Sequence, residues 1–277
     1  MVSALDLVAG WPGSSRGLIV LHDDGHGALT RATVGDLETP FEWASVTKVA
    51  TALCAMVAVD EGLITLEDEV GPPGSTVRHL LAHASGVGPD SPMVLCAPAT
   101  RRIYSNAGFE LLASHLERWS GSSIEALVDE TVLTPLGMAE TRLTGSPASG
   151  MLGPVGDLAL LLAETMAPTL LGDATATAMR TVQWPALAGV LPGVGRYDPC
   201  AWGLGLEVKG HKEPHWTGST WGPATVGHFG RAGGFLVVDP SRSLGVVSLG
   251  DEPFGAWALE AWPPLLDALE AGDEGGR

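Results

Sequence analysis

The stretch from Phe41 to Leu53 constrains the fold most, because it sets a lysine inside an apolar run. From position 45 it reads Ser-Val-Thr-Lys-Val-Ala-Thr-Ala-Leu, which predicts a helix that begins near Ser45, since serine is a favoured capping residue. The chain has only three lysines, and no acidic residue at positions 43–59 is available to pair with Lys48. We therefore expect apolar neighbours to desolvate Lys48.

Ser45 and Lys48 have the spacing of an activated nucleophile and its base. Residues three apart lie on one face of a helix, so the ammonium can approach the hydroxyl group. Loss of solvation lowers the pKa of a lysine and lets it accept a proton, and the start of a helix favours negative charge. Both effects point to acyl transfer. A Ser-x-x-Lys match alone is weak, since a capping serine near a solvated lysine is commoner.

A second set of polar side chains lies in the segment Arg101-Arg102-Ile103-Tyr104-Ser105-Asn106. In an extended segment alternate residues face the same way, so Tyr104 and Asn106 can point into one cleft. A phenol near Lys48 would have its pKa lowered by the ammonium and act as base and then acid, while Asn106 holds Lys48 or the substrate. Which of Lys48 and Tyr104 is the base stays open, because their titrations would be coupled.

A glycine-rich segment near the C-terminus, Gly227-His228-Phe229-Gly230-Arg231, reads as an edge strand. Glycines such as Gly230 allow the backbone to approach another segment closely. The N–H of Arg231 would then join that of Ser45 in an oxyanion hole. His228 would face the cleft and assist substrate binding.

The composition of the chain excludes some classes of binding partner. The 277 residues include 15 Lys and Arg against 32 Asp and Glu, a formal net charge of −17. This charge makes nucleic acid and anionic membrane surfaces poor partners. The motifs above instead suit a small ester, amide or short peptide as substrate. A long apolar span and a basic, apolar leader are both absent, which predicts a cytoplasmic protein. Cys54, Cys96 and Cys200 are widely spaced, so we expect neither a disulfide framework nor a zinc site, and no metal or organic cofactor.

Strand patterns lie at both ends of the chain around a helical middle. Strands are predicted at 17–22, 28–34, 202–208, 228–238 and 244–249; helices are predicted from 106 to about 121, at 123–132, from about 155 with Asp157 as its cap, and at 253–270. The boundaries between 170 and 194 stay open. The pattern predicts one α+β domain over 5–275, with an α/β lobe from about 5–60 plus 195–275 and a helical lobe of about 61–194.

Three motifs in this order resemble the serine β-lactamase and penicillin-recognising superfamily. They are Ser45-Val46-Thr47-Lys48 as Ser-x-x-Lys, Tyr104-Ser105-Asn106 as Tyr-x-Asn, and His228-Phe229-Gly230 as Lys/His-x-Gly. The chain is similar in particular to the class C β-lactamase-like group, which includes D,D-carboxypeptidases, D-aminopeptidases and family VIII esterases. The resemblance implies a β-lactamase/transpeptidase-like fold, in which an antiparallel sheet is flanked by helices and an inserted helical lobe leaves Ser45 in the cleft.

The third motif departs from that of true β-lactamases, which carry Lys-Thr-Gly to hold the β-lactam carboxylate. Here His228 would supply a weaker, titratable cation and Phe229 supplies no hydroxyl group, so weak or no β-lactamase activity is expected. Trp221 and Phe229 are candidates to line an apolar acyl or alcohol pocket, although large aromatic side chains more often belong to a core.

The leading hypothesis is a serine hydrolase that cleaves a small carboxylic ester or amide through an acyl-Ser45 intermediate. A D-amino-acid peptidase or carboxypeptidase, an acyltransferase on the same residues and a non-catalytic binding protein are the alternatives. The natural substrate, its stereochemistry and the oligomeric state stay open.

Overall fold

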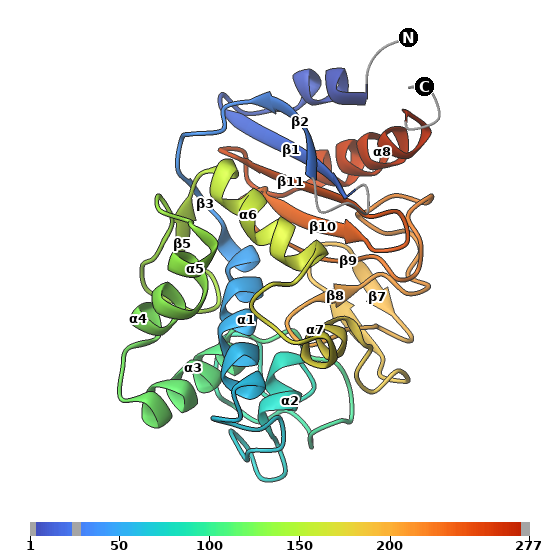
Figure 1. The fold of residues 1–277 in the computed structure, drawn as a ribbon. Helices are drawn as coiled ribbons and strands as arrows, with labels where there is room; N and C mark the ends of the chain where they lie inside the picture. Colours follow the sequence, from blue (N-terminus) through green and yellow to red (C-terminus); the bar gives the residue numbers. More distant parts are fainter. Residues whose placement is uncertain (1–3, 24–28, 273–277) are drawn as a thin grey trace.

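The computed structural model describes residues 4–23 and 29–272. Residue 28 of the predicted second strand and residues 273–275 of the predicted domain lie outside these ranges. The helices are α1 (Thr47–Asp60), α2 (Val77–Leu81), α3 (Asn106–Ser120), α4 (Ile124–Val128), α5 (Thr134–Leu136), α6 (Val155–Met166), α7 (Asp173–Arg180) and α8 (Ala256–Gly272), with 3-10 turns η1 (Ala4–Gly10) and η2 (Ala44–Val46) and a π-helical turn η3 (Asp129–Leu133) (Figure 1). The strands are β1 (Arg16–Asp23), β2 (Leu29–Gly35), β3 (Phe41–Glu42), β4 (Arg142–Leu143), β5 (Met151–Gly153), β6 (Gly189–Leu191), β7 (Gly195–Tyr197), β8 (Glu207–Val208), β9 (Val226–Phe229), β10 (Phe235–Asp239) and β11 (Leu244–Gly250).

Six antiparallel strands form the main sheet, in the spatial order β2-β1-β11-β10-β9-β8. β1 from the start of the chain pairs with β11 from its end, and Ile19 lies opposite Val247. The predicted α+β fold, with one sheet built from distant segments, is confirmed. The predicted strand at 228–238 is instead two strands, β9 and β10, that pair with each other.

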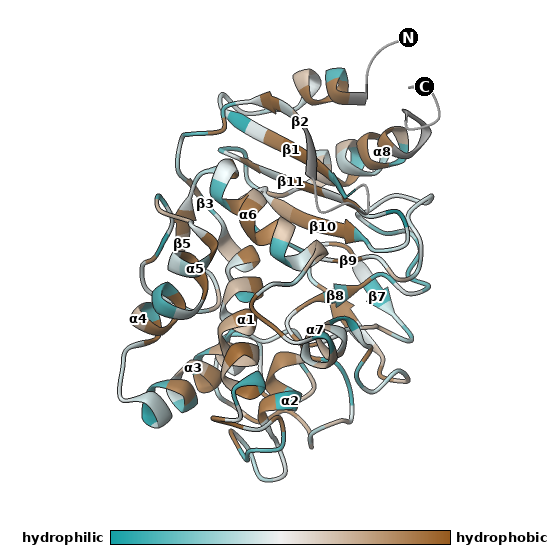
Figure 2. Ribbon diagram, in the orientation of Figure 1, coloured by the Kyte–Doolittle hydropathy of each residue, from teal (hydrophilic) through white to brown (hydrophobic). Residues whose placement is uncertain are grey.

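The central strands are buried on both faces, and alternate side chains enter different cores. Ile19 and Val247 lie in a core with α1 and α6, whereas Leu18 and Val246 lie in a second core with Trp262 of α8. α6 packs on β1, β10 and β11, although its sequence position falls within the predicted helical lobe. Figure 2 shows the central strands and α1 as largely apolar.

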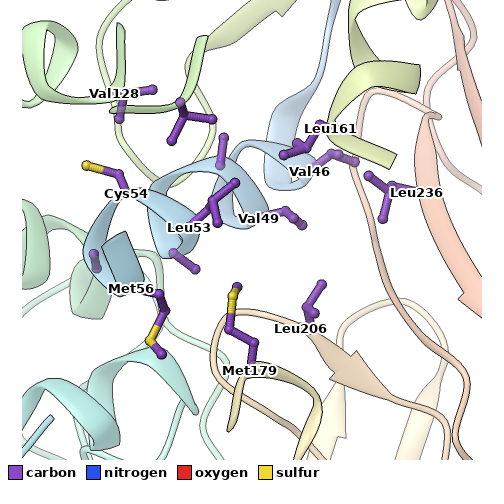
Figure 3. Close-up of a cluster of buried hydrophobic side chains, with 14 of the residues drawn as sticks. Val46, Val49, Leu53, Cys54, Met56, Val128, Leu161, Met179, Leu206 and Leu236 are labelled. Atoms are coloured by element: carbon purple, nitrogen blue, oxygen red, sulfur yellow. The ribbon is translucent and has the colours of Figure 1, made fainter. Parts of the chain in front are cut away.

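α1 passes through the middle of the molecule and is buried from Thr47 to Ala58 (Figure 1). A helix that is apolar all round is a core helix. It contacts α3, α4 and η3 on one side and α7 on another. Figure 3 shows Val49 and Leu53 in one cluster with Leu161 of α6 and Leu206. Core packing from several elements therefore fixes the helix that carries the Ser-x-x-Lys motif.

Two predicted caps are wrong. Ser45 lies inside the 3-10 turn η2, and no side chain caps that turn. Asp157 lies in the first turn of α6, whose N-cap is Pro154. Its carboxylate instead accepts hydrogen bonds from the Glu140 N–H at 2.9 Å and from Thr141 Oγ1 at 2.8 Å. Tertiary contacts, which local sequence patterns do not reveal, take Asp157 away from capping, whereas Ser45 lies within the 3-10 turn that precedes α1.

Other elements agree more closely with the predictions or lie where no boundaries were predicted. The helix predicted from Asn106 is confirmed as α3, which ends at Gly121 with a left-handed φ of 77°. Of the strand predicted at 202–208, only β8 pairs with β9. α7 and β6 occupy the stretch between 170 and 194. Within the described residues, every helix is too short or too polar to cross a bilayer.

All three lysines are buried, so a buried lysine is not by itself a mark of the active site. Lys48, Lys209 and Lys212 are 0%, 4% and 1% exposed. Lys209 Nζ donates to the carbonyl groups of Gly218 and Trp221, both at 2.7 Å. The scarcity of lysine therefore does not single out Lys48, because this fold buries all three of its lysines.

Glu207 on β8 is the centre of a buried ionic cluster. Its Oε1 lies 3.0 Å from Lys212 Nζ and accepts from His215 Nε2 at 2.9 Å, while its Oε2 accepts from Trp216 Nε1 at 2.7 Å. Burial alone would raise the pKa of this carboxyl group, but Lys212 and His215 hold it well below its usual range. The cluster ties the segment after β8 to the sheet.

Glu207→Gln is expected to lower the free energy of unfolding by about 3 kcal/mol, because loss of one partner leaves the Lys212 charge buried and uncompensated. Denaturant titration followed by circular dichroism measures the change. Glu213→Gln is the matched control, since Glu213 is 60% exposed and lies 3.7 Å from Lys209. It should cost less than about 1 kcal/mol. Equal losses in the two variants would contradict the role of the buried cluster.

Candidate active site

Ser45 is presented by a strained turn between β3 and α1. The preceding residue, Ala44, has a left-handed φ of 44°, a conformation that costs roughly 1 kcal/mol for a residue with a Cβ. Such strain is held in place by surrounding structure and is typical of functional sites. Trp43, fully buried, anchors the turn by donating from Nε1 to the Gly153 carbonyl at 3.0 Å. Ser45 is half-buried and its side chain is free of capping.

Lys48 is buried with neutral partners only. Its Nζ lies 3.3 Å from Ser45 Oγ, 2.6 Å from Asn106 Oδ1 and 2.8 Å from the Ala148 carbonyl oxygen. Burial lowers the pKa of Lys48 to about 7, although Asp90 and Glu110 oppose the shift. A substantial fraction of Lys48 is therefore neutral near pH 7 and can accept the serine proton.

The orientation of Asn106 is set by a residue that the sequence did not reveal. Asn106 Oδ1 accepts from Lys48, and Nδ2 donates to Asp90 Oδ1 at 2.7 Å. A carboxylate can only accept, and an ammonium can only donate, so the two partners fix which end of the amide faces Lys48. Asp90 thereby positions Asn106, and no local motif around position 90 signals this role.

Tyr104 is half-buried between Lys48 and His83, and its hydroxyl oxygen is buried. Lys48 Nζ lies 4.8 Å from the centre of its ring, and the His83 ring centre lies 4.5 Å away. The hydroxyl group lies beside Ser45 but makes no hydrogen bond of good geometry within the described residues. Burial raises the pKa of Tyr104 well above its ordinary value, so the expectation that Lys48 lowers this pKa is wrong. The phenol is a proton donor at neutral pH.

His228 is neutral and presents an acceptor. Its Nδ1 donates to the Phe229 carbonyl at 2.8 Å, which leaves the lone pair on Nε2. That atom is buried and has no partner among the described residues. Burial, reinforced by Lys48, lowers the pKa of His228 to about 3. The prediction of a titratable cation at this position is therefore wrong, because the site is too dry and too close to another cation.

β9 brings the third motif against the nucleophile. β8 pairs with β9 only as far as Gly227, so the next residues form the open edge that the sequence predicted, and this end contacts η2. A side chain at Gly230 would collide with the Trp43 carbonyl oxygen, and its Cβ would lie 3.3 Å from Ser45 N. Within the described chain, neither the Ser45 N–H nor the Arg231 N–H donates to a protein acceptor. Two unpaired donors on adjoining segments suit an oxyanion.

Two cavities meet at the nucleophile. One, of about 900 Å³, extends past Asn106, and the other, of about 250 Å³, extends past His228 and Phe229. Ser45 and Tyr104 border both. Phe229 thus lines a pocket as the sequence suggested. Trp221 does not, because it belongs to a core and donates from Nε1 to the Leu266 carbonyl.

Several lining residues were not foreseen, because their positions depend on long-range folding. Trp202 and Glu207 border the smaller cavity, and Asp90 and Arg196 border the larger one. The cysteines are free, with Cys54 and Cys200 buried. No cluster of three or more His, Cys, Asp or Glu side chains suited to a metal occurs in the part of the chain that the structure describes.

The chain is similar to known proteins along most of its length. The profile of the family described as Beta-lactamase matches residues 18–256. The solved structure of a beta-lactamase from Mycobacterium bovis is 44% identical, with a TM-score of 0.93 over 97% of this chain and 98% of that one.

Two curated relatives match over shorter segments. Penicillin-binding protein 4* of Bacillus subtilis (strain 168) is 30% identical over 156 residues, 44% of this chain and 34% of that protein. The D-alanyl-D-alanine-carboxypeptidase/endopeptidase AmpH of Escherichia coli (strain K12) is 27% identical over 148 residues, 40% of this chain and 38% of that protein. Both matches therefore span well under half the length of the relative. The family profile, the fold and the three motifs agree, and the chain belongs to the Beta-lactamase family of the serine β-lactamase and penicillin-recognising superfamily.

Proposed function

We propose that this chain is a serine hydrolase that cleaves a small carboxylic ester or amide through an acyl-Ser45 intermediate. The observation that carries the proposal is the position of Lys48 Nζ, 3.3 Å from Ser45 Oγ and hydrogen-bonded only to neutral groups. The other two buried lysines each have a carboxylate within 4 Å, Lys212 with Glu207 at 3.0 Å and Lys209 with Glu213 at 3.7 Å, whereas no ion pair of Lys48 occurs among the described residues. Lys48 instead keeps a lowered pKa beside a hydroxyl group, which suits a general base.

The geometry supports one assignment of proton transfers. Neutral Lys48 takes the proton of Ser45 Oγ as this oxygen attacks the substrate carbonyl carbon, and the N–H groups of Ser45 and Arg231 bind the oxyanion. When the bond to the leaving group breaks, Tyr104 gives its proton to the departing oxygen or nitrogen, and Lys48 returns a proton to Tyr104. Water then attacks the acyl-enzyme, and the same groups move the proton in the opposite direction. Asn106 holds Lys48 in place throughout.

The neutral state of His228 bears on the substrate. Without a cation at this position, the carboxylate of a β-lactam lacks its usual partner in the third motif, so β-lactam turnover should be weak or absent. The same reasoning weakens the D-amino-acid peptidase and carboxypeptidase alternative at this position. The substrate class that remains is a small ester or amide whose group beside His228 is uncharged.

Acyl transfer is a second candidate, favoured by the cavity of about 900 Å³ beside Ser45. This space is large enough to hold an alcohol or amine that competes with water for the acyl-enzyme. Product analysis with and without a candidate acceptor separates the two activities. Hydrolysis products alone, at every acceptor concentration, would exclude transfer.

Ser45→Ala is expected to reduce hydrolysis of a short-chain nitrophenyl ester by at least about 10⁴-fold, because no other group replaces the nucleophile. A fluorophosphonate probe should add its mass to the wild type and not to the variant, as measured by intact-protein mass spectrometry. Circular dichroism checks that the fold is kept. Ser122→Ala, in the turn between α3 and α4, is the control and should retain full activity. Undiminished activity in Ser45→Ala would end the proposal.

The pH dependence of kcat/KM should reflect the titration of Lys48. Its pKa is lowered to about 7, and the neutral form is active, so kcat/KM should rise about tenfold per pH unit below about 7 and level off above it. Asp90→Asn should move the midpoint to lower pH, because the Asp90 charge raises the pKa of Lys48. A profile that stays flat from about pH 5 to 9, or a midpoint that moves upward in the variant, would contradict Lys48 as base.

Gly230→Ala should lower kcat by about 100-fold, because the added Cβ pushes β9 away from Trp43 and separates the two oxyanion donors. Single-turnover acylation measured by stopped flow tests this. The matched control is Gly222→Ala, whose Cβ would have no neighbour nearer than 3.7 Å. If both variants acylate at the wild-type rate, the close approach of β9 is not needed for catalysis.

A further inference from the structure

The two cavities beside Ser45 differ in their chemistry. The smaller is lined by apolar side chains, among them Leu191, Trp202 and Phe229, which are buried. Ser45, Tyr104 and Arg231 border both cavities, and the polar groups that line the smaller one alone are the lone pair of His228 Nε2 and the carboxylate of Glu207. Both repel an anion and neither can donate to one. This pocket therefore suits an uncharged, apolar group.

The larger cavity is bordered by three exposed arginines in a chain of net charge −17. Arg101, Arg196 and Arg231 line it, and none of their guanidinium groups forms a hydrogen bond or ion pair with any residue that the structure describes. The carboxylate in the lining, Asp90, is engaged by Asn106 Nδ2. A concentration of unpaired guanidinium groups at one cavity of an acidic protein points to an anionic ligand.

The two environments also differ in access to solvent. Arg101, Val190 and Arg196 at the larger cavity are exposed and one of its 16 lining residues is buried, whereas five of the 11 residues that line the smaller cavity are buried. In hydrolysis the acyl group stays bonded to Ser45 until water arrives, while the leaving group must depart first. The enclosed pocket therefore suits the acyl chain, and the open cavity suits the leaving group.

We infer that the preferred substrate joins an uncharged, apolar acyl group to a leaving group that carries a carboxylate or phosphate, which Arg101 and Arg196 bind in the larger cavity. This inference rests on the proposed hydrolase function. Guanidinium groups bind carboxylate and phosphate through paired, charge-assisted hydrogen bonds. Since both arginines are exposed, their effect should fall as salt concentration rises.

The test uses four esters that carry no charge, a charge on the leaving group or a charge on the acyl group. They are phenyl butyrate, 4-carboxyphenyl butyrate, 4-(phosphonooxy)phenyl butyrate and the monophenyl ester of succinic acid. For each, kcat/KM is measured for the wild type, Arg101→Gln, Arg196→Gln and the double variant. Arg142→Gln is the matched control, because Arg142 is exposed on β4 and lines neither cavity. Comparing ratios between proteins cancels differences in the intrinsic reactivity of the esters.

The ratio of kcat/KM for an anionic leaving group to that for phenyl butyrate should fall about tenfold in the double variant and stay unchanged in Arg142→Gln. In the double variant kcat/KM for the uncharged phenyl butyrate should change less than kcat/KM for either anionic leaving group, and the succinate ester should be the poorest substrate throughout. A larger drop with the phosphate or with the carboxylate ester identifies which anion the arginines select. The inference would be overturned if the esters were hydrolysed but these kcat/KM ratios were the same in the wild type and in the double variant. A preference for the succinate ester would overturn it as well. Loss of all ester hydrolysis would instead overturn the proposed function.

Discussion

The burial of Lys48 is the constraint on which the rest of the site depends. An ammonium group without a carboxylate partner is costly to bury, and α1 places it at 0% exposure with two oxygen acceptors and one hydroxyl group as partners. The fold tolerates this because α1 is held on all sides by apolar packing (Figure 3). The energy that packing supplies is what keeps a reactive lysine beside Ser45.

The Ser-x-x-Lys and Tyr-x-Asn motifs predicted which side chains lie together at the candidate site, because the spacing within each motif already implies where its residues lie. Ser45 and Lys48 lie one helical turn apart, and Tyr104 and Asn106 border the same cavity. The sheet assembled from both chain ends followed from the strand patterns and is confirmed by the pairing of β1 with β11. These features depend on local periodicity and on the order of elements.

Properties that depend on tertiary environment could not be predicted in the same way. The scarcity of lysine suggested a special role for Lys48, yet Lys209 and Lys212 are buried as well and bind backbone carbonyl groups or a carboxylate. Asp90 becomes part of the site only because its loop lies against the start of α3. His228 was predicted to be a titratable cation but is neutral. The sequence shows the residue type but not how far its surroundings exclude water.

One physical effect, desolvation, separates the roles of the three titratable groups around Ser45. Burial disfavours whichever form is charged, so it lowers the pKa of Lys48 to about 7, lowers that of His228 to about 3 and raises that of Tyr104 well above its ordinary value. At neutral pH the same interior thus contains a partly neutral amine, a neutral imidazole with a free lone pair and a protonated phenol. The three protonation states that the proposed mechanism uses therefore arise without any of the three groups being paired to an opposite charge. A variant that let water into this interior would move all three pKa values toward their ordinary ranges together, so the site is better described as one desolvated unit than as separately tuned residues.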